Sequence, residues 1–449
     1  MTKKPILSIT LIFALAFGGV VFFIIYKNIN TSFGSLKLKV YPVTAQIKIN
    51  EKLYHSTNGN FNIKLNQGDY LINGFLNGYL PYEQKITIES NQEIILDDIY
   101  LLPLNWPKKI LIEKPDIQNF YLSKDNNRIL YLEKTKDKNT KIIYQWEIFD
   151  RGTQKTEEVF SSNVSPQEVQ FISKKILTEL KTNDWQIILP IKSLLRDLNI
   201  VSQSLNNLFE KHLKEINPKL SKEIKKAAFS NDEENKIVIQ TKDSVFLYDS
   251  VSDNLFLLQQ GETSAFVNDN NNLYFLDKNG LLIKTNLNSP FNSETLSLFS
   301  LETKNVENTK IRKNQEKEQF LIVTSDGKLY YLDPKNSTLP TVISENVKEA
   351  NFANLNIVIF QLENKENEWI IYNLKDNTQK EIESLMMPLQ FLKEDYWLVS
   401  RENNLGIYDL KNEKFILIAE NILQDNVFFD KVLKRIFFIT SEGINETSY

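Results

Sequence analysis

Few side chains in this sequence are suited to covalent or metal chemistry. The chain has 449 residues, no cysteine and two histidines, His55 and His212. Thiolate catalysis, disulfide bonds and zinc sites built from several cysteines or histidines are therefore excluded. The GxSxG, HExxH and P-loop motifs are also missing. We expect no metal and no cofactor, with His55 in a polar loop and His212 solvated beside Lys211 and Lys214.

Carboxylates offer another route to catalysis, because a positioned pair can act as general acid and base. Four aspartates recur at the end of a strand-like segment in the repeats described below, namely Asp150, Asp249, Asp333 and Asp409. Such recurrence indicates turn or capping hydrogen bonds rather than catalysis. We predict no catalytic residue from the sequence. An enzyme with a carboxylate pair at a central channel stays open as an alternative.

The overall composition is that of packed globular domains. Hydrophobic residues make up 42% of the chain and charged residues 24%, which excludes a largely disordered or fibrous protein. The chain has 53 Lys+Arg and 57 Asp+Glu, a formal net charge of -4. Because no basic stripe interrupts this mixture of charges, we expect no nucleic-acid partner.

The N-terminal segment from Pro5 to Tyr26 carries no charged residue. At about 1.5 Å per residue it matches a hydrocarbon core about 30 Å thick, which predicts a transmembrane helix in the lipid bilayer. Lys3 and Lys4 precede the helix, so the positive-inside rule places the N-terminus in the cytoplasm and the bulk of the chain outside the plasma membrane. A signal peptide cleaved near residues 14–16 is the alternative.

Apolar and polar residues alternate between residues 35 and 102. The apolar positions fall two apart, as in Leu36/Leu38/Val40, Ile47/Ile49, Phe61/Ile63/Leu65 and Ile86/Ile88. This period of two is typical of half-buried strands. Turn residues, such as those at 58–59 and 77–78, separate the runs. The pattern predicts a small antiparallel β-sandwich.

Particular residues of this segment match a known module. Pro42 and Ala45 begin and end a four-residue turn after the first strand, and Gly78 and Tyr79 form a late Gly-Tyr pair. In these features the segment resembles the PEGA domain, a β-sandwich module of microbial surface proteins, although Thr44 replaces the glycine of the Pro-Glu-Gly-Ala turn. The resemblance implies a fold and a surface setting without a catalytic activity.

From residue 108 onward the sequence repeats an apolar strand, a short polar turn and a second apolar strand. The segments 320–324, 325–327 and 329–333 form one copy, and further copies begin at Ile129, Ile176, Lys236, Leu273, Ile357, Tyr396 and Arg435. Second strands end at residues 286, 333, 373 and 409, which gives spacings of 47, 40 and 36 by subtraction. Propeller blades of four strands repeat about every 40–50 residues.

These repeats predict a β-propeller of eight blades, or of seven if the copy beginning at Ile176 is not a blade. The last copy stops at Tyr449 without its fourth strand. The strand-like segment 109–113 precedes the first copy without a partner, so we predict that it completes the last blade. Joining the two ends in one blade would close the ring and remove exposed strand edges.

An insertion interrupts the repeats between residues 193 and 216. Its apolar positions recur three or four residues apart and include Leu194, Leu198, Leu205, Leu208 and Leu213, a spacing typical of an amphipathic helix. Such a helix could dock on a partner. The alternatives are that its apolar stripe packs on the propeller itself, or that its early part is a blade strand.

The fold class predicted is all-β, with a transmembrane helix, a PEGA-like sandwich and a propeller that carries one helical insertion. The domains are residues 1–29 (cytoplasmic tip and anchor), 30–102 (sandwich), 103–107 (linker) and 108–449 (propeller). We expect a membrane-anchored surface protein whose propeller binds a protein or an envelope glycan without catalysis. An enzyme acting on envelope polysaccharide and a structural envelope component are the alternatives.

Overall fold

The computed structural model describes residues 33–448 apart from short gaps. The gaps are residues 57, 97–98, 124, 137–139, 173–174, 182, 193–197, 231–232, 270, 298–305, 366–367, 383–385, 394–395, 411–412, 424–425 and 431–433. The chain divides into two compact units. The first comprises the residues up to Lys108 together with those from Thr447 onward, and the second comprises Lys109–Glu446. The predicted membrane helix from Pro5 to Tyr26 lies outside the described residues.

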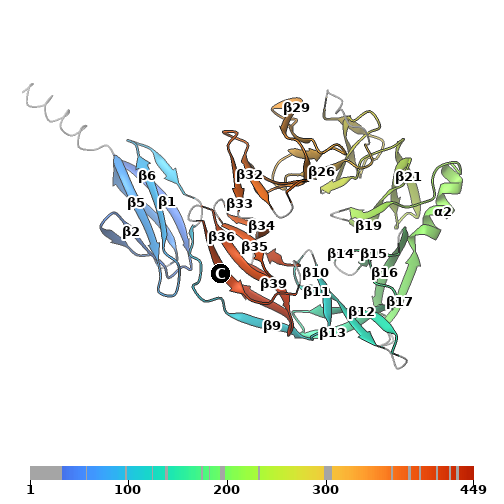
Figure 1. Ribbon diagram of the computed structural model, residues 1–449, viewed down its shortest axis with the longest axis horizontal. Coiled ribbons are helices and arrows are strands. Elements are labelled where there is room, and N and C mark those ends of the chain that lie inside the picture. The colour runs from blue at the N-terminus through green and yellow to red at the C-terminus, as the bar shows by residue number, and fades with distance from the viewer. Residues whose placement is uncertain are drawn as a thin grey trace, which may run out of the picture. The chain divides into compact units, whose positions relative to one another are not determined.

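The first unit is a β-sandwich, as the alternating sequence predicted. Its strands are β1 (Phe33–Tyr41), β2 (Gln46–Ile49), β3 (Lys52–Tyr54), β4 (Asn60–Asn66), β5 (Gly68–Phe75), β6 (Tyr82–Ile88), β7 (Glu93–Ile95) and β8 (Ile99–Tyr100). One sheet has the order β4-β1-β7 with β8 also paired to β1, and the other has the order β3-β2-β5-β6 (Figure 1). Leu36 and Ile63 from the first sheet share a core with Ile47 and Ile88 from the second.

The residues of the PEGA resemblance occupy turns and the edge of this core. The backbone N–H of Ala45 donates to the carbonyl of Pro42 at 2.9 Å, which closes the turn between β1 and β2. Ala45 is buried, and Tyr79 packs against the sandwich core. Gly78 has φ +83°, a conformation that favours glycine. His55 is exposed and follows β3 outside any strand, which confirms its prediction as a loop residue.

The second unit consists of successive four-stranded antiparallel sheets (Figure 1). The first four are formed by β10 (Ile117–Leu122), β11 (Arg128–Lys136), β12 (Ile142–Asp150) and β13 (Lys155–Ser162); β14 (Glu168–Ile172), β15 (Lys175–Lys181), β16 (Asp184–Lys192) and β17 (Leu198–Ser204); β18 (Lys226–Ser230), β19 (Glu233–Gln240), β20 (Ser244–Asp249) and β21 (Asn254–Gln260); and β22 (Val267–Asp269), β23 (Asn272–Leu276), β24 (Leu282–Asn286) and β25 (Ser293–Thr295).

The other four sheets follow the same order along the chain. They are formed by β26 (Lys310–Lys313), β27 (Phe320–Val323), β28 (Leu329–Asp333) and β29 (Ser337–Ser344); β30 (Val347–Phe352), β31 (Ile357–Leu362), β32 (Trp369–Asn373) and β33 (Gln379–Ile382); β34 (Met386–Lys393), β35 (Tyr396–Arg401), β36 (Asn404–Asp409) and β37 (Lys414–Ala419); and β38 (Phe428–Asp430), β39 (Arg435–Thr440), β40 (Gly443–Ser448) and β9 (Lys108–Glu113). The segment beginning at Ile176 belongs to a complete sheet, so the described residues form eight blades rather than seven.

The last sheet closes the unit into a ring. Its order is β38-β39-β40-β9, so a strand from the beginning of the unit completes the blade at its end, as predicted from the unpaired segment 109–113. Phe120 of β10 packs with Phe437 and Ile439 of β39 in one buried cluster. The second unit is therefore a β-propeller whose first and last blades are joined by strand pairing and by a shared core.

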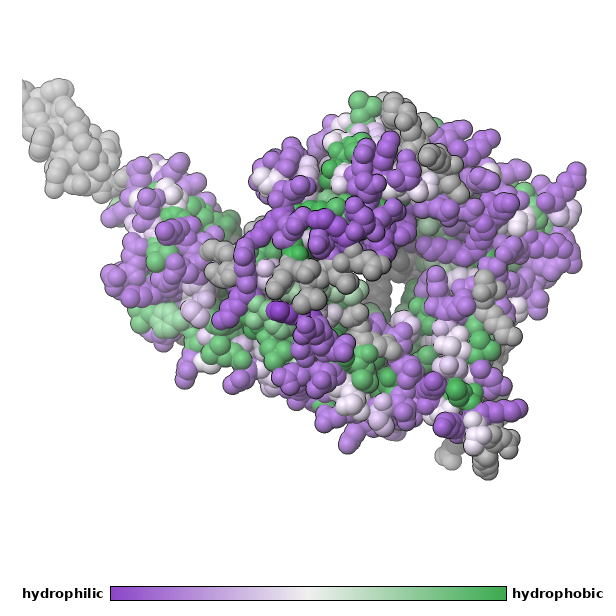
Figure 2. All heavy atoms as spheres, viewed as in Figure 1, coloured by the Kyte–Doolittle hydropathy of each residue, from purple (hydrophilic) through white to green (hydrophobic). Residues whose placement is uncertain are grey.

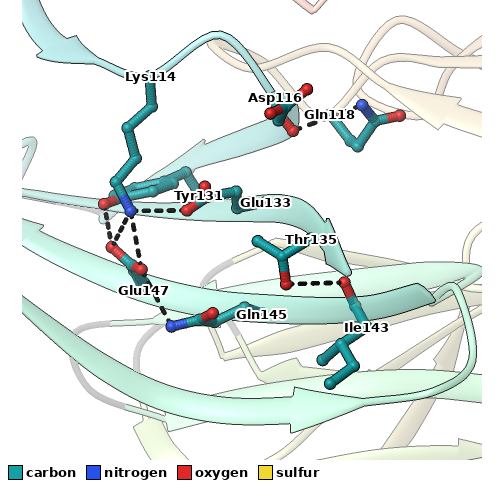
Figure 3. A network of polar contacts seen from close by, with 9 residues as sticks. All are labelled: Lys114, Asp116, Gln118, Tyr131, Glu133, Thr135, Ile143, Gln145 and Glu147. Atoms are coloured by element: carbon teal, nitrogen blue, oxygen red, sulfur yellow. Dashed lines mark hydrogen bonds and ion pairs between the residues drawn. The ribbon is translucent and has the colours of Figure 1, made fainter. Parts of the chain in front are cut away.

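A network of polar side chains strengthens this junction (Figure 3). The ammonium group of Lys114, just after β9, donates to Glu133 Oε2 at 2.6 Å and to both carboxylate oxygens of Glu147 at 2.9 Å. The hydroxyl of Tyr131 also donates to Glu147. Burial lowers the pKa of Lys114, but its hydrogen bonds to Glu133 and Glu147 outweigh that effect and raise the pKa well above its ordinary value. Lys114 is therefore a cation that holds the closing strand β9 against the blade formed by β10–β13.

A second ion pair joins the same two blades. Arg151, which follows β12, donates from Nη2 to Glu446 Oε2 on β40 at 2.6 Å. Arg435 of β39 donates to the same oxygen at 3.1 Å. The Arg151 and Glu446 side chains are only 13% and 11% exposed. Because both are largely shielded from water, this contact is screened less than a surface ion pair.

We predict that Gly443→Ala destabilises the propeller more than a matched glycine change. Gly443 has φ +129°, and a Cβ there would overlap the carbonyl oxygen of Ile112 on β9. Gly261 has φ +113°, but the nearest atom to its Cβ position is 3.4 Å away on the flexible Lys278 side chain. Gly261→Ala should cost about 1 kcal/mol, and Gly443→Ala at least about 2 kcal/mol more, measured by urea unfolding. Equal losses would show that β9 is not tightly held.

We also predict that Lys114→Met lowers the free energy of unfolding by about 2–4 kcal/mol, because it leaves the Glu147 carboxylate buried without its cation. Glu147 has a side chain only 8% exposed. Lys155→Met, at an exposed position of β13, is the control and should be nearly neutral. Adding Glu147→Gln to Lys114→Met should restore part of the loss, and a double variant no more stable than Lys114→Met would contradict this explanation.

Candidate functional site

The first strands of the sheets surround the centre of the propeller. Each first strand is an edge of its own sheet, and consecutive first strands contact one another in the pairs β10 with β14, β14 with β18, β22 with β26 and β26 with β30. They therefore converge on one axis. Figure 2 shows an opening at the centre of this unit. The unpaired backbone groups of these edges face the channel and need hydrogen-bond partners.

Side-chain amides supply many of these partners. Gln170 of β14 donates to the carbonyl of Ala227 at 3.1 Å and accepts from the N–H of Phe229 at 3.0 Å, both on β18. Gln390 of β34 accepts from the N–H of Phe429 on β38 at 3.2 Å. Asn426 donates to the carbonyl of Phe120 on β10 at 3.3 Å, across the closing junction. The amides thus link neighbouring blades around the channel.

None of these amides was predicted as a site residue, although the sequence contains a signal for them. An amide or arginine side chain recurs at corresponding positions of three successive first strands, at Arg312, Asn351 and Gln390, with two spacings of 39 residues by subtraction. A phenylalanine follows directly in the last two cases and also after Gln170. Polar residues recurring with the blade period, each before an apolar residue of a first strand, are a pattern that marks the channel lining.

A cavity of about 420 Å³ opens among three of the first strands, β26, β30 and β34. Phe352, Ala353, Pro388, Leu389 and Trp397 provide its apolar lining. Trp397 is 1% exposed and packs in the core between the blades that contain β30 and β34, so it supports the wall from behind. A cavity of this size suits the side chains of a bound ligand.

Polar groups line the rest of the cavity. Arg312 of β26 is exposed and donates from Nε to Asn351 Oδ1 at 3.1 Å. Asn314 is buried and donates to the carbonyl of Asn354 at 3.2 Å. Lys313 forms an ion pair with Asp269 at 2.6 Å, so its charge is balanced within the protein.

Among the described residues that line the cavity, Glu316 is the one carboxylate, whereas glycoside hydrolysis usually needs two. No group of three or more His, Asp or Glu side chains suited to a metal ion occurs in the described part of the chain. The arrangement is suited to binding by shape, hydrogen bonds and charge.

Three of the four aspartates at the ends of the hairpins, Asp150, Asp249 and Asp333, accept structural hydrogen bonds, as predicted. Asp150 accepts from the backbone N–H and the hydroxyl of Thr153 at 2.9 and 3.2 Å. The hydrogen bond from the backbone N–H of Thr153 is the largest of the effects that lower the pKa of Asp150. Asp249 accepts from the N–H of Val251 at 2.9 Å. Asp333 accepts from the side-chain amides of Gln319 and Asn336, both at 2.9 Å. These carboxylates have structural partners outside the cavity.

The helical insertion is shorter than predicted. The structure places Leu198–Ser204 in β17, paired with β16, and begins helix α2 (Leu205–Ile216) only at Leu205. Leu194 lies outside the described residues. The Ser204 hydroxyl accepts from the N–H of Asn207 at 3.3 Å and caps the helix. The prediction of helix at Leu198 was wrong, and the alternative that the early part of the insertion is a blade strand holds there, because pairing with the free edge of β16 prevails over helical periodicity.

The apolar stripe of α2 packs on the propeller itself, which is the alternative interpretation given above. Leu205 and Leu213 are buried in a cluster with Trp185 of β16 and Phe246 of β20, and Leu208 packs against it. These leucines, which were candidates for docking, are therefore buried in this core or packed against it, and they offer a partner little surface.

The prediction that His212 is solvated was wrong. His212 is 7% exposed, and its Nε2 donates to Asp253 Oδ1 at 2.9 Å. Tyr248 donates to the same oxygen, and Lys211 donates to Oδ2 at 3.1 Å. Hydrogen bonds from Lys211, Tyr248 and His212 lower the pKa of Asp253 to about 2. Asp253 lies in the turn between β20 and β21. The residues that flank His212 in the sequence did not indicate its contact with this turn.

Among the described residues, no helix is long and apolar enough to cross a bilayer. The membrane helix from Pro5 to Tyr26 therefore stays a prediction, and so does the extracytoplasmic location that follows from it.

Comparison with known protein families supports the propeller. Residues 259–447 match the NUP159/214 β-propeller family. The matched range covers the blades from β22 onward. It does not include residues 30–102, so the PEGA resemblance stays a prediction.

Solved structures align with most of the chain at low identity. They include the designed protein Ika8 (13% identity, TM-score 0.43, 76% of this chain and 98% of that one), Saccharomyces cerevisiae Sqt1 (10%, 0.44, 77% and 97%) and Chaetomium thermophilum Sqt1 bound to the N-terminus of ribosomal protein L10 (10%, 0.43, 75% and 97%). No curated protein matches the chain.

Proposed function

We propose that this chain is a non-catalytic scaffold whose propeller binds a partner protein at the cavity among β26, β30 and β34. The observation that carries the proposal is the composition of the cavity wall. The apolar side chains of Pro388 and Leu389 line the same cavity as the exposed guanidinium of Arg312 and the amide of Asn351. A wall that combines apolar side chains with an oriented polar donor is suited to a peptide segment that carries both kinds of side chain.

The proposal includes a membrane setting. The uncharged run from Pro5 to Tyr26 would anchor the chain, and the PEGA-like sandwich would separate the propeller from the bilayer. The length of the run and the lysines before it support this part of the proposal. Recognition of an envelope glycan is less favoured, because the cavity has few exposed aromatic faces on which a sugar ring could stack.

The binding test is capture of partner proteins by the full-length chain and by two matched variants. Leu389→Asp places a charge on the apolar wall and should reduce capture of a saturable partner at least about tenfold, since burying an unpaired carboxylate is costly. Leu339→Asp makes the same change at an exposed position, 59% accessible, on β29 of the same blade as β26, and should capture normally. Equal capture by the two variants would refute the cavity as the binding site.

The membrane proposal predicts the outcome of protease treatment of intact cells. Residues after the anchor should be digested from outside, while a tag fused before Lys3 should be protected until the cells are lysed. Protection of the propeller in intact cells, with a cytoplasmic marker equally protected, would overturn the extracytoplasmic location.

A further inference from the structure

Three exposed basic side chains lie on β26 and β30, the strands that contribute Arg312 and Asn351 to the cavity lining. Lys310 and Arg312 alternate along β26, and both are exposed. Lys348 lies on the neighbouring strand β30 and is exposed as well. The ammonium group of Lys310 donates to the carbonyl of Lys348 at 3.2 Å, which places the two strands' basic residues side by side.

These three cations have no carboxylate partner among the described residues. Other basic side chains nearby do: Lys225 pairs with Glu307, Lys313 with Asp269, and Lys284 with Glu318. The protein thus neutralises its neighbouring charges and leaves an unbalanced positive edge, which we call the basic edge, formed by Lys310, Arg312 and Lys348. Unbalanced charge beside a cavity attracts a ligand of opposite sign.

Arg312 is oriented for this role. Its Nε donates to Asn351 Oδ1 at 3.1 Å and its Nη1 makes a long contact, 3.5 Å, with the carbonyl of Ile311. A guanidinium group has five N–H donors, so these two contacts fix its position and leave donors for a bidentate carboxylate.

Acidic side chains limit the basic edge to one part of the cavity wall. Glu316 also lines the cavity, and Glu349 is half-buried on β30 between Lys348 and Ala350. The excess of positive charge is therefore small and local. A long polyanion such as nucleic acid needs many phosphate contacts, whereas a peptide carboxylate needs only one oriented guanidinium and a place for its neighbouring side chain.

We infer that the cavity recognises an acidic peptide segment in which a glutamate or aspartate lies next to an apolar residue. The carboxylate binds Arg312 at the basic edge, and the apolar side chain packs on Pro388 and Leu389. This inference rests on the proposed protein-binding function and specifies the chemistry of the partner. It assigns charge recognition to Arg312 and shape recognition to the wall formed by β34.

The test is a selection from a random-peptide display library against the full-length chain. Enriched peptides should carry acidic residues beside apolar ones, and a fluorescent copy should bind less tightly as salt is raised. Arg312→Gln should weaken binding of that peptide about tenfold, in line with the loss of a charge-assisted hydrogen bond. Lys335→Gln removes the same charge in the exposed turn between β28 and β29, and should leave the affinity unchanged.

Several results would overturn the inference. They are enrichment of neutral or basic peptides, no enrichment at all, equal affinity of Arg312→Gln and the wild type, or stronger binding of a single-stranded oligonucleotide probe than of the acidic peptide. Thermal unfolding of Arg312→Gln provides the folding control. If Arg312→Gln captures the cellular partner normally while Leu389→Asp does not, the scaffold function stands and the acidic specificity fails. If Leu389→Asp captures as well as Leu339→Asp, the proposed function itself fails.

Discussion

Pairing of β9 with β40 is the constraint on which the rest of the propeller depends. It joins residues from opposite ends of the unit in one sheet, so that no blade keeps an unpaired hydrophobic edge at the junction. Gly443 allows the close approach of the two backbones, and Lys114 fixes the strand through Glu133 and Glu147. A loss of this pairing would release the first and last blades from each other, and with them the ring that brings distant first strands together.

Closure of the ring also determines the chemistry of the channel. Each first strand presents backbone groups that its own sheet leaves unpaired, and the amides of Gln170, Gln390 and Asn426 satisfy some of them on the next blade. An amide can donate and accept at once, which makes it a suitable link between two strand edges. The same choice makes the lining of the channel polar.

The cavity among β26, β30 and β34 combines these features with an apolar wall. Among the described lining residues Glu316 is the one carboxylate, and Lys313 is neutralised by Asp269. The proposed binding needs an oriented donor and a complementary surface. Arg312 and the apolar side chains of β34 provide those two elements.

The sequence by itself determined the local structure of this protein, because the period-two alternation and turn residues act over a few positions. They predicted the sandwich strands, the hairpins with their capping aspartates, and even the closing strand 109–113, which had no partner of its own. Tertiary structure alone decided the start of α2, because residues 198–204 pair with β16 as a strand. It also decided the burial of His212 against Asp253, 41 residues away by subtraction. It also decided the cavity, because Arg312, Asn351 and Gln390 come from separate blades, and only closure of the ring brings residues so distant in sequence to one wall.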